Sequence, residues 1–188
     1  MLTGGEGRRL GGIDKALIDV GGRRLIDCAM ARAASWGAPI VVSARTAKPW
    51  HAKLEISIVL DRPDCVGPLA GVTAVFAGAG LDVDVVVTVT VDCPNLPADL
   101  VERLVTAAAE SGKIAVAESE SGQHHLIAAW PRISFAAVRA AVDSGVVSVH
   151  RAQACHGTVA VSWRGVDPDP FLNLNTPADV ERWVRRPS

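Results

Sequence analysis

The sequence predicts an α/β protein whose mostly parallel central sheet lies between two layers of helices. Short apolar runs rich in Val and Ile alternate with longer segments of helical periodicity along the 188-residue chain. Several runs are apolar at consecutive positions, which is typical of strands covered by helices on both faces. Strand followed by helix, repeated along the chain, indicates βαβ units. These observations predict a Rossmann-like three-layer fold in one domain, residues 1–188.

The elements follow from this alternation in chain order. Apolar runs, several of them β-branched, predict strands over 40–42, 56–60, 85–91, 114–116, 126–130 and 159–161. The segments between them predict helices over 24–36, 69–79, 97–111, 131–143 and 176–185. The last helix has the clearest start, because Thr176 precedes Pro177 and Asp179 completes a capping-box-like pattern.

The composition is typical of a globular protein and excludes several partners. Nineteen basic residues against twenty acidic residues leave a net charge of -1, so no bulk field attracts nucleic acid or an anionic membrane. We find no apolar run near the ~20 residues that a membrane span needs, and no signal-peptide pattern. The four cysteines lie far apart and form no CxxC pair, so we expect reduced thiols and a cytoplasmic protein.

Two apolar strands end directly on an aspartate, Asp61 after ISIVL and Asp92 after VVVTVTV. In an open α/β sheet, ligands bind at the carboxyl ends of the strands, where such a carboxylate meets the ligand. An aspartate at a strand end also starts turns and caps helices, and this interpretation stays open for either residue alone. Hard oxygen donors suit Mg²⁺, which normally arrives with substrate phosphates. The pair therefore favours a metal and phosphate site.

The opening MLTGGEGRRLGGIDKAL is a glycine-rich loop with clustered cations. It matches neither the dinucleotide fingerprint, whose last glycine falls on Leu10, nor a P-loop. Glycines let backbone N–H groups crowd around an anion, and Arg8, Arg9 and Lys15 add positive charge suited to phosphate. A flexible surface loop is the alternative, but the clustered cations favour phosphate binding.

A second polar group stands before the last helix, in the segment FLNLNTPAD. Side chains alternate along an extended segment, so Asn173 and Asn175 point one way while Leu172 and Leu174 point into the core. The two amides either satisfy local backbone groups or hold a polar ligand.

These motifs, taken in order, resemble a known family. The opening GGEGRRLGGIDKAL resembles the signature loop of nucleotidylyltransferases. The segments GPLAG at 67–71, VDCPNLP at 91–97 and the closing NLNTPADVERW narrow the resemblance to the molybdenum cofactor guanylyltransferase family. The similarity runs nearly from end to end of the chain.

The resemblance implies transfer of GMP from GTP to the phosphate of Mo-molybdopterin, with release of pyrophosphate. It implies nucleotide contacts at Leu2, Thr3, Gly4, Gly5, Lys15, Ser43, Asp61 and Asp92. It places Mg²⁺ on Asp92 and the pterin side of the site at Asn173 and Asn175. The attacking phosphate is already largely ionised at neutral pH, since its second pKa is about 6, so no general base is needed. Lys15, Asp92 and Arg8 or Arg9 then act by positioning and electrostatics.

The sequence departs from the family pattern in its first strand. Only Met1 and Leu2 precede the Thr3-Gly4-Gly5 loop, where the family has a whole apolar strand, so we expect this strand to be missing or truncated and the natural start to lie upstream. Ser43 stands where the family has asparagine.

Three alternatives stay open at this stage. They are a cytidylyltransferase or other transferase acting on a small phosphate, a non-catalytic nucleotide-binding protein, and an adaptor that hands the pterin to molybdoenzyme partners.

Overall fold

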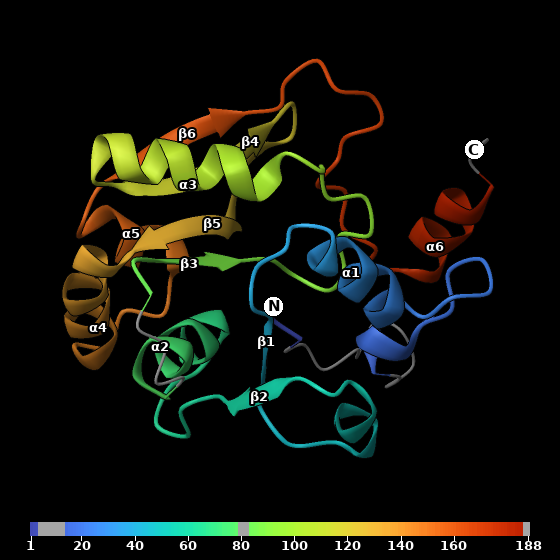
Figure 1. Ribbon diagram of the computed structural model, residues 1–188, viewed down its shortest axis with the longest axis horizontal. Helices are drawn as coiled ribbons and strands as arrows, with labels where there is room; N and C mark the ends of the chain where they lie inside the picture. The colour runs from blue at the N-terminus through green and yellow to red at the C-terminus, as the bar shows by residue number, and fades with distance from the viewer. Residues whose placement is uncertain (4–13, 79–82, 186–188) are drawn as a thin grey trace.

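The computed structural model describes residues 1–3, 14–78 and 83–185, and it has the predicted α/β architecture (Figure 1). Its strands are β1 (Val41–Ala44), β2 (Ser57–Leu60), β3 (Val85–Thr88), β4 (Ile114–Ser119), β5 (Gly122–Pro131) and β6 (Thr158–Ser162). Its α-helices are α1 (Leu25–Ala34), α2 (Pro68–Gly78), α3 (Leu100–Ser111), α4 (Phe135–Asp143), α5 (Val149–Ala154) and α6 (Pro177–Val184). Short 3-10 turns are η2 (Lys15–Leu17), η3 (Pro49–Lys53) and η4 (Arg132–Ser134).

Each predicted strand and helix is present, with shifted bounds. The predicted strand 126–130 is the second half of a longer strand, and η4 occupies the start of the predicted helix 131–143. Helix α5 was not predicted. Its six residues lack the length that makes helical periodicity recognisable in a sequence.

The first three residues join two groups of strands into one sheet. Strands β1 and β2 pair in parallel, and β3, β5, β4 and β6 are neighbours in that order. Between the two groups, Leu2 forms parallel bridges to both Ser43 and Thr90. The Leu2 N–H donates to Val89 O at 2.8 Å, and the Ser43 N–H donates to Met1 O at 2.9 Å. Residues 1–3 thus lie in the middle of the sheet.

The sheet is mostly parallel, as predicted, but β5 breaks the expected run of βαβ units. Strand β5 is antiparallel to both β3 and β4, whereas β4 and β6 are parallel. Only Glu120 and Ser121 separate β4 from β5, and a two-residue turn joins antiparallel strands because a parallel crossover needs a dozen residues or more. The expectation of a repeated strand-helix order is therefore wrong at this hairpin.

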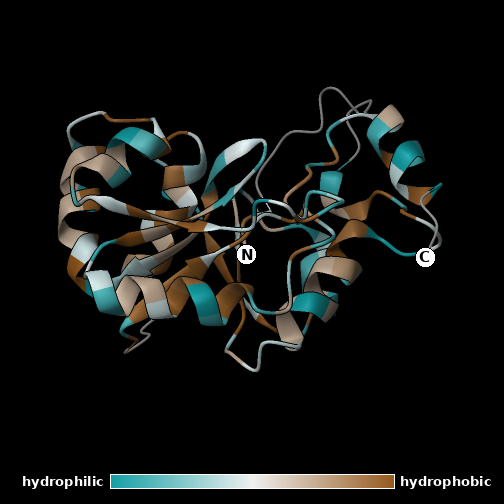
Figure 2. Ribbon diagram, turned by 90° about the horizontal axis from the view of Figure 1, so that it is seen from above, coloured by the Kyte–Doolittle hydropathy of each residue, from teal (hydrophilic) through white to brown (hydrophobic). Residues whose placement is uncertain are grey.

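Helices cover both faces of the sheet, as the consecutive apolar runs predict. In β4, Ala115 and Ala117 pack in one cluster with α3, while Ile114 and Val116 pack on the other face in a cluster with α2, α4 and α5. Figure 1 shows α3 on one side of the sheet and α2 and α4 on the other. The strands are mostly brown in Figure 2, whereas the helices carry teal, hydrophilic positions as well.

A third apolar cluster packs together segments that lie far apart along the chain. It joins Ala16 of η2, Leu25 and Ile26 of α1, Trp50 of η3 and Leu174 before α6. Within the described ranges, no helix is both long and apolar enough to cross a membrane.

A buried hydrogen bond between β3 and β5 offers a test of this packing. The Trp130 indole N–H donates to Thr88 Oγ1 at 2.8 Å, and both side chains are buried. In Thr88→Val the isosteric side chain cannot accept this bond. We expect the free energy of unfolding to fall by about 1–3 kcal/mol, since a buried donor loses its partner.

Urea denaturation measures this change. Thr106→Val, at an exposed position of α3, is the control and should leave the midpoint nearly unchanged. Equal stability of the two variants would contradict a structural role for the hydrogen bond.

Candidate functional site

A cleft of about 870 Å³ opens at the carboxyl ends of β1 and β2 and beside the segment that follows β3. Six of the predicted nucleotide-site residues line it: Leu2, Thr3, Lys15, Ser43, Asp61 and Asp92. The predicted Gly4, Gly5, Arg8 and Arg9 lie outside the described residues. The fold thus brings together side chains that are far apart in sequence, at the edge of the sheet where ligands of α/β proteins bind.

The centre of the cleft is an ion pair between Lys15 and Asp92. Lys15 Nζ lies 2.6 Å from Asp92 Oδ2, and the two side chains are only 13% and 19% exposed. Lys15 Nζ also donates to Asn175 Oδ1, from a residue 160 positions later in the chain. Low exposure and a second hydrogen-bond partner hold the ammonium group in one place. A fixed cation beside a carboxylate suits a ligand that carries phosphates and a metal ion.

Asn175 therefore contacts Lys15, which the sequence analysis did not anticipate. The resemblance implied the pterin side of the site for Asn175 and no contact with Lys15. No local pattern reports a contact between residues so far apart, because periodicity and capping describe neighbours along the chain.

Asn173 lies beside the Asp92–Cys93 segment. The Cys93 thiol donates to Asn173 Oδ1 at 3.0 Å, and the Leu174 N–H donates to Asp92 O at 3.0 Å. Burial raises the pKa of Cys93 to about 12, so the group stays a thiol and can act as a donor. Leu174 is buried in the core while both asparagines are exposed, so the predicted alternation of this segment is confirmed.

The start of α6 is built as predicted. Thr176 Oγ1 accepts from the Asp179 N–H at 3.2 Å, and Asp179 Oδ2 accepts from the Thr176 N–H at 2.9 Å. Asp179 Oδ2 also accepts from the Asn175 N–H at 3.1 Å. This capping box fixes the backbone of Asn175 and so helps to aim its amide at Lys15.

At the other end of the cleft, Ser43 and Asp61 form a second polar pair. Ser43 Oγ donates to Asp61 Oδ1 at 2.5 Å, and Ser43 is only 2% exposed. The N–H and hydroxyl of Thr3 both donate to Ser43 O, at 3.0 and 2.8 Å. In this arrangement Ser43 orients the Asp61 carboxylate.

Gly71, in the first turn of α2, lies against this pair. A Cβ added there would lie 2.3 Å from Ser43 Oγ and 3.0 Å from Asp61 Oδ1. Only glycine leaves room for the hydroxyl and the carboxylate at this approach of the helix. The GPLAG segment thus has a steric reason for its last glycine.

A polar cluster at the turn between β4 and β5 anchors the chain that leads to Asn173. Asp169 Oδ2 accepts from the hydroxyls of Ser119 and Ser121, each at 2.8 Å, and Asp169 Oδ1 accepts from the Phe171 N–H at 2.9 Å. Burial opposes ionisation of Asp169, but these hydrogen bonds outweigh it and lower the pKa. Because the carboxylate is fully engaged, its role is to hold residues 169–171. No local sequence motif indicates this role for Asp169.

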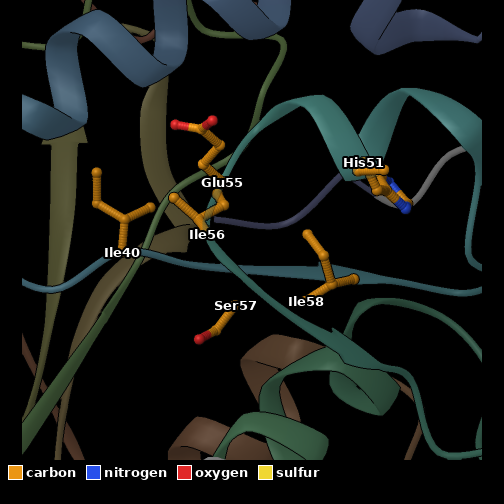
Figure 3. A pocket seen from close by; sticks show the side chains of 7 residues that line it. Ile40, His51, Glu55, Ile56, Ser57 and Ile58 are labelled. Atoms are coloured by element: carbon orange, nitrogen blue, oxygen red, sulfur yellow. The ribbon is translucent and has the colours of Figure 1, made fainter.

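A second hollow, of about 580 Å³, lies at the start of β2. Figure 3 shows its polar side chains, those of Glu55, Ser57 and His51, pointing in different directions. A ligand site needs polar groups that converge on one point, so this hollow is the weaker candidate.

Comparisons with known proteins agree with the geometry of the cleft. Residues 1–158 match the family model described as the MobA-like NTP transferase domain. A molybdenum cofactor guanylyltransferase of Nitrobacter hamburgensis is 34% identical over 186 residues, covering 96% of this chain and 89% of that protein. The enzyme of the same name from Acidiphilium cryptum is 36% identical over 184 residues, covering 96% and 90%.

A solved structure shows the same fold. Molybdopterin-guanine dinucleotide biosynthesis protein A from Archaeoglobus fulgidus superposes with a TM-score of 0.80 at 22% identity, covering 97% of this chain and 94% of that one.

Because Gly71 lies so close to Ser43 and Asp61, we expect alanine at this position to destabilise the protein, whereas alanine usually stabilises a helix. Replacing a helical glycine by alanine usually stabilises a protein by about 0.5–1 kcal/mol. In Gly71→Ala the new methyl group would overlap Ser43 Oγ, so we expect the free energy of unfolding to fall by about 1–3 kcal/mol instead.

Thermal unfolding measures the effect. Ala77→Gly, at an exposed position of the same helix, calibrates helix propensity and should cost about 1 kcal/mol. A Gly71→Ala protein more stable than the parent would show that the cleft has space at this position.

Proposed function

The chain belongs to the family of MobA-like NTP transferase domains, and from that premise we propose that it transfers GMP from GTP to the phosphate of Mo-molybdopterin. The relatives that cover nearly the whole chain at about 35% identity carry the name of this activity. The reaction releases pyrophosphate. It makes the protein a nucleotidyltransferase, and we propose that residues 1–188 form one domain of this type.

The contact of Lys15 with both Asp92 and Asn175 is the observation that carries this proposal. The reaction must bring together two anions, the triphosphate of GTP and the phosphate of the acceptor. We assign Lys15 to the phosphates of GTP and the Asn173–Asn175 segment to the acceptor. On this assignment the two substrates would lie on either side of one ammonium group.

The acceptor phosphate needs no general base, because it is largely ionised at neutral pH. The residues of the cleft contribute by position and charge. Lys15 lowers the repulsion between the two anions and stabilises negative charge on the departing pyrophosphate. We propose that Arg8 and Arg9, a few positions earlier in the sequence, add to this effect.

We propose Mg²⁺ as the cofactor, held by Asp92. Mg²⁺ is bound in proteins through one or two carboxylates together with substrate phosphates, and Asp92 supplies one carboxylate in the cleft that we assign to GTP. When bound, the ion neutralises phosphate charge and orients the triphosphate.

The Ser43–Asp61 pair is our candidate for base recognition. A carboxylate accepts hydrogen bonds, and guanine offers adjacent N–H donors on its Watson–Crick edge. Leu2 and Thr3 also line the cleft, and we propose that Gly4 and Gly5 contact the nucleotide as well. The four free cysteines and GTP as substrate favour the cytoplasm as the site of the reaction. We further propose transient delivery of the product to molybdoenzyme partners.

Nucleotide selectivity tests the proposed substrate. We expect calorimetry to detect binding of GTP with Mg²⁺, and at least about tenfold weaker binding of CTP and ATP, since a difference of about 1.4 kcal/mol in hydrogen bonding gives that ratio. Preference for CTP would identify a cytidylyltransferase instead. Binding of GTP without turnover of Mo-molybdopterin would favour a non-catalytic nucleotide-binding protein.

Asp92 gives the corresponding test of mechanism. In Asp92→Ala we expect pyrophosphate release from GTP and Mo-molybdopterin to fall by about 10²–10³-fold, the loss typical of removing one electrostatic contact to the transition state. The matched control is Glu110→Ala, at an exposed position of α3, which should keep full activity.

Circular dichroism should show an intact fold in both variants, because Asp92 lies at the surface of the cleft. Mg²⁺-dependent turnover that survives in Asp92→Ala would remove this residue from the mechanism.

A further inference from the structure

We propose that Asp14 is a positioning residue for Lys15, and that Lys48 and Trp50 hold it in place. We call these three residues the Asp14 clamp. The proposal rests on the proposed function, because it concerns the lysine that we assign to the phosphates of GTP. It extends the site to η3, a segment to which neither the motifs nor the resemblance assigned a role.

Both carboxylate oxygens of Asp14 are engaged. Asp14 Oδ2 accepts from Lys48 Nζ at 2.8 Å and from the Trp50 indole N–H at 2.9 Å. Asp14 Oδ1 accepts from the Ala16 N–H at 3.2 Å and so caps η2. The side chain of Asp14 is only 13% exposed. A carboxylate bound on both oxygens has a single orientation. This also restricts the backbone of Asp14.

The charge of Asp14 strengthens this arrangement. Burial opposes ionisation, but the hydrogen bonds from Lys48 and Trp50 outweigh it, and the pKa of Asp14 is lowered. The carboxylate is therefore ionised at neutral pH. Its hydrogen bonds are charge-assisted, which makes them stronger than bonds between neutral groups.

Lys15 follows Asp14 directly and begins the capped turn. The Leu17 N–H donates to Asp14 O at 2.9 Å, so both the backbone and the side chain of Asp14 close this turn. Ala16, in the middle of the turn, is completely buried, and it packs in the same apolar cluster as Trp50. The clamp thus determines where the backbone of Lys15 lies and hence how its ammonium group reaches Asp92.

The Asp14 clamp also connects Lys15 to the half of the cleft that we assign to the base. Lys48 and Trp50 belong to the connection between β1, which carries Ser43, and β2, which precedes Asp61. Asp14, Lys15, Lys48 and Trp50 all line the cleft. Movement of η3 would therefore be transmitted through Asp14 to the phosphate end.

The experiment removes one donor at a time and measures binding of GTP with Mg²⁺ by calorimetry. Trp50→Phe keeps an aromatic ring, although a smaller one, in the apolar cluster and removes the indole N–H. Lys48→Met keeps the length of the side chain and removes the ammonium group, whereas Lys48→Arg retains a cationic donor. Loss of a group that orients a binding residue typically costs about tenfold or more, so we expect at least about tenfold weaker binding in Trp50→Phe and Lys48→Met. We expect near-parental binding in Lys48→Arg.

Matched controls come from the same chain. Trp36→Phe also removes an indole N–H, which donates to Pro97 O at 3.4 Å away from the cleft. Lys53→Met removes an exposed lysine from the same turn, η3. Both should bind GTP with Mg²⁺ like the parent protein. All variants should unfold within a few degrees of the parent, because a positioning role changes binding more than global stability.

Each outcome bears on one of the two proposals. Binding that is unchanged in Trp50→Phe would overturn the clamp, and so would weakening in Lys48→Met alone, because Lys48 would then contact the nucleotide itself. Equally large losses of GTP binding in Trp36→Phe or Lys53→Met would also overturn the Asp14 clamp. A parent protein that binds no GTP would instead overturn the proposed function on which the clamp rests.

Discussion

The backbone pairing of residues 1–3 is the constraint on which the rest of the structure depends. Leu2 is hydrogen-bonded to the segment after β3, while Met1 and Thr3 pair with β1. These bonds unite two groups of strands that share no other strand pair among the described residues. Because paired strands have a fixed register, they also place Ser43 and Thr90, and hence Asp61 and Asp92, along one edge of the sheet. The cleft is a consequence of this pairing.

Charge balance organises the cleft before any ligand is present. Lys15 faces Asp92, and Asp14 faces Lys48, so each of these two lysines has a carboxylate partner within 3 Å. A partly buried charge without a partner would be costly, so these pairs stabilise the open site. They also keep the ammonium groups close to the position that phosphates would occupy. Preorganised charge of this kind is the main contribution that a protein can make to phosphoryl transfer.

Neutral groups supply the finer orientation. The capping box at Thr176 fixes the backbone of Asn175, and the Cys93 thiol donates a hydrogen bond to the amide oxygen of Asn173. Asp169 holds the chain just before these asparagines by accepting from two hydroxyls and one N–H. The Asn173–Asn175 segment is thus anchored at several points, although it has no regular secondary structure before α6.

The sequence by itself determined the features that depend on neighbours along the chain. Runs that are apolar at consecutive positions, such as 114–116, identify strands buried on both faces. The order of Thr176, Pro177 and Asp179 identifies a helix start. Both signals are local, because periodicity and capping involve neighbours along the chain. The ordered motifs also pointed to the family, and the strand-end carboxylates pointed to the edge of the sheet. Only the tertiary structure decided the antiparallel direction of β5, the contact of Lys15 with Asn175, the steric need for Gly71 and the partners of Asp14. Each of these is a contact between distant segments, and a single sequence carries no local signal of which segments will meet.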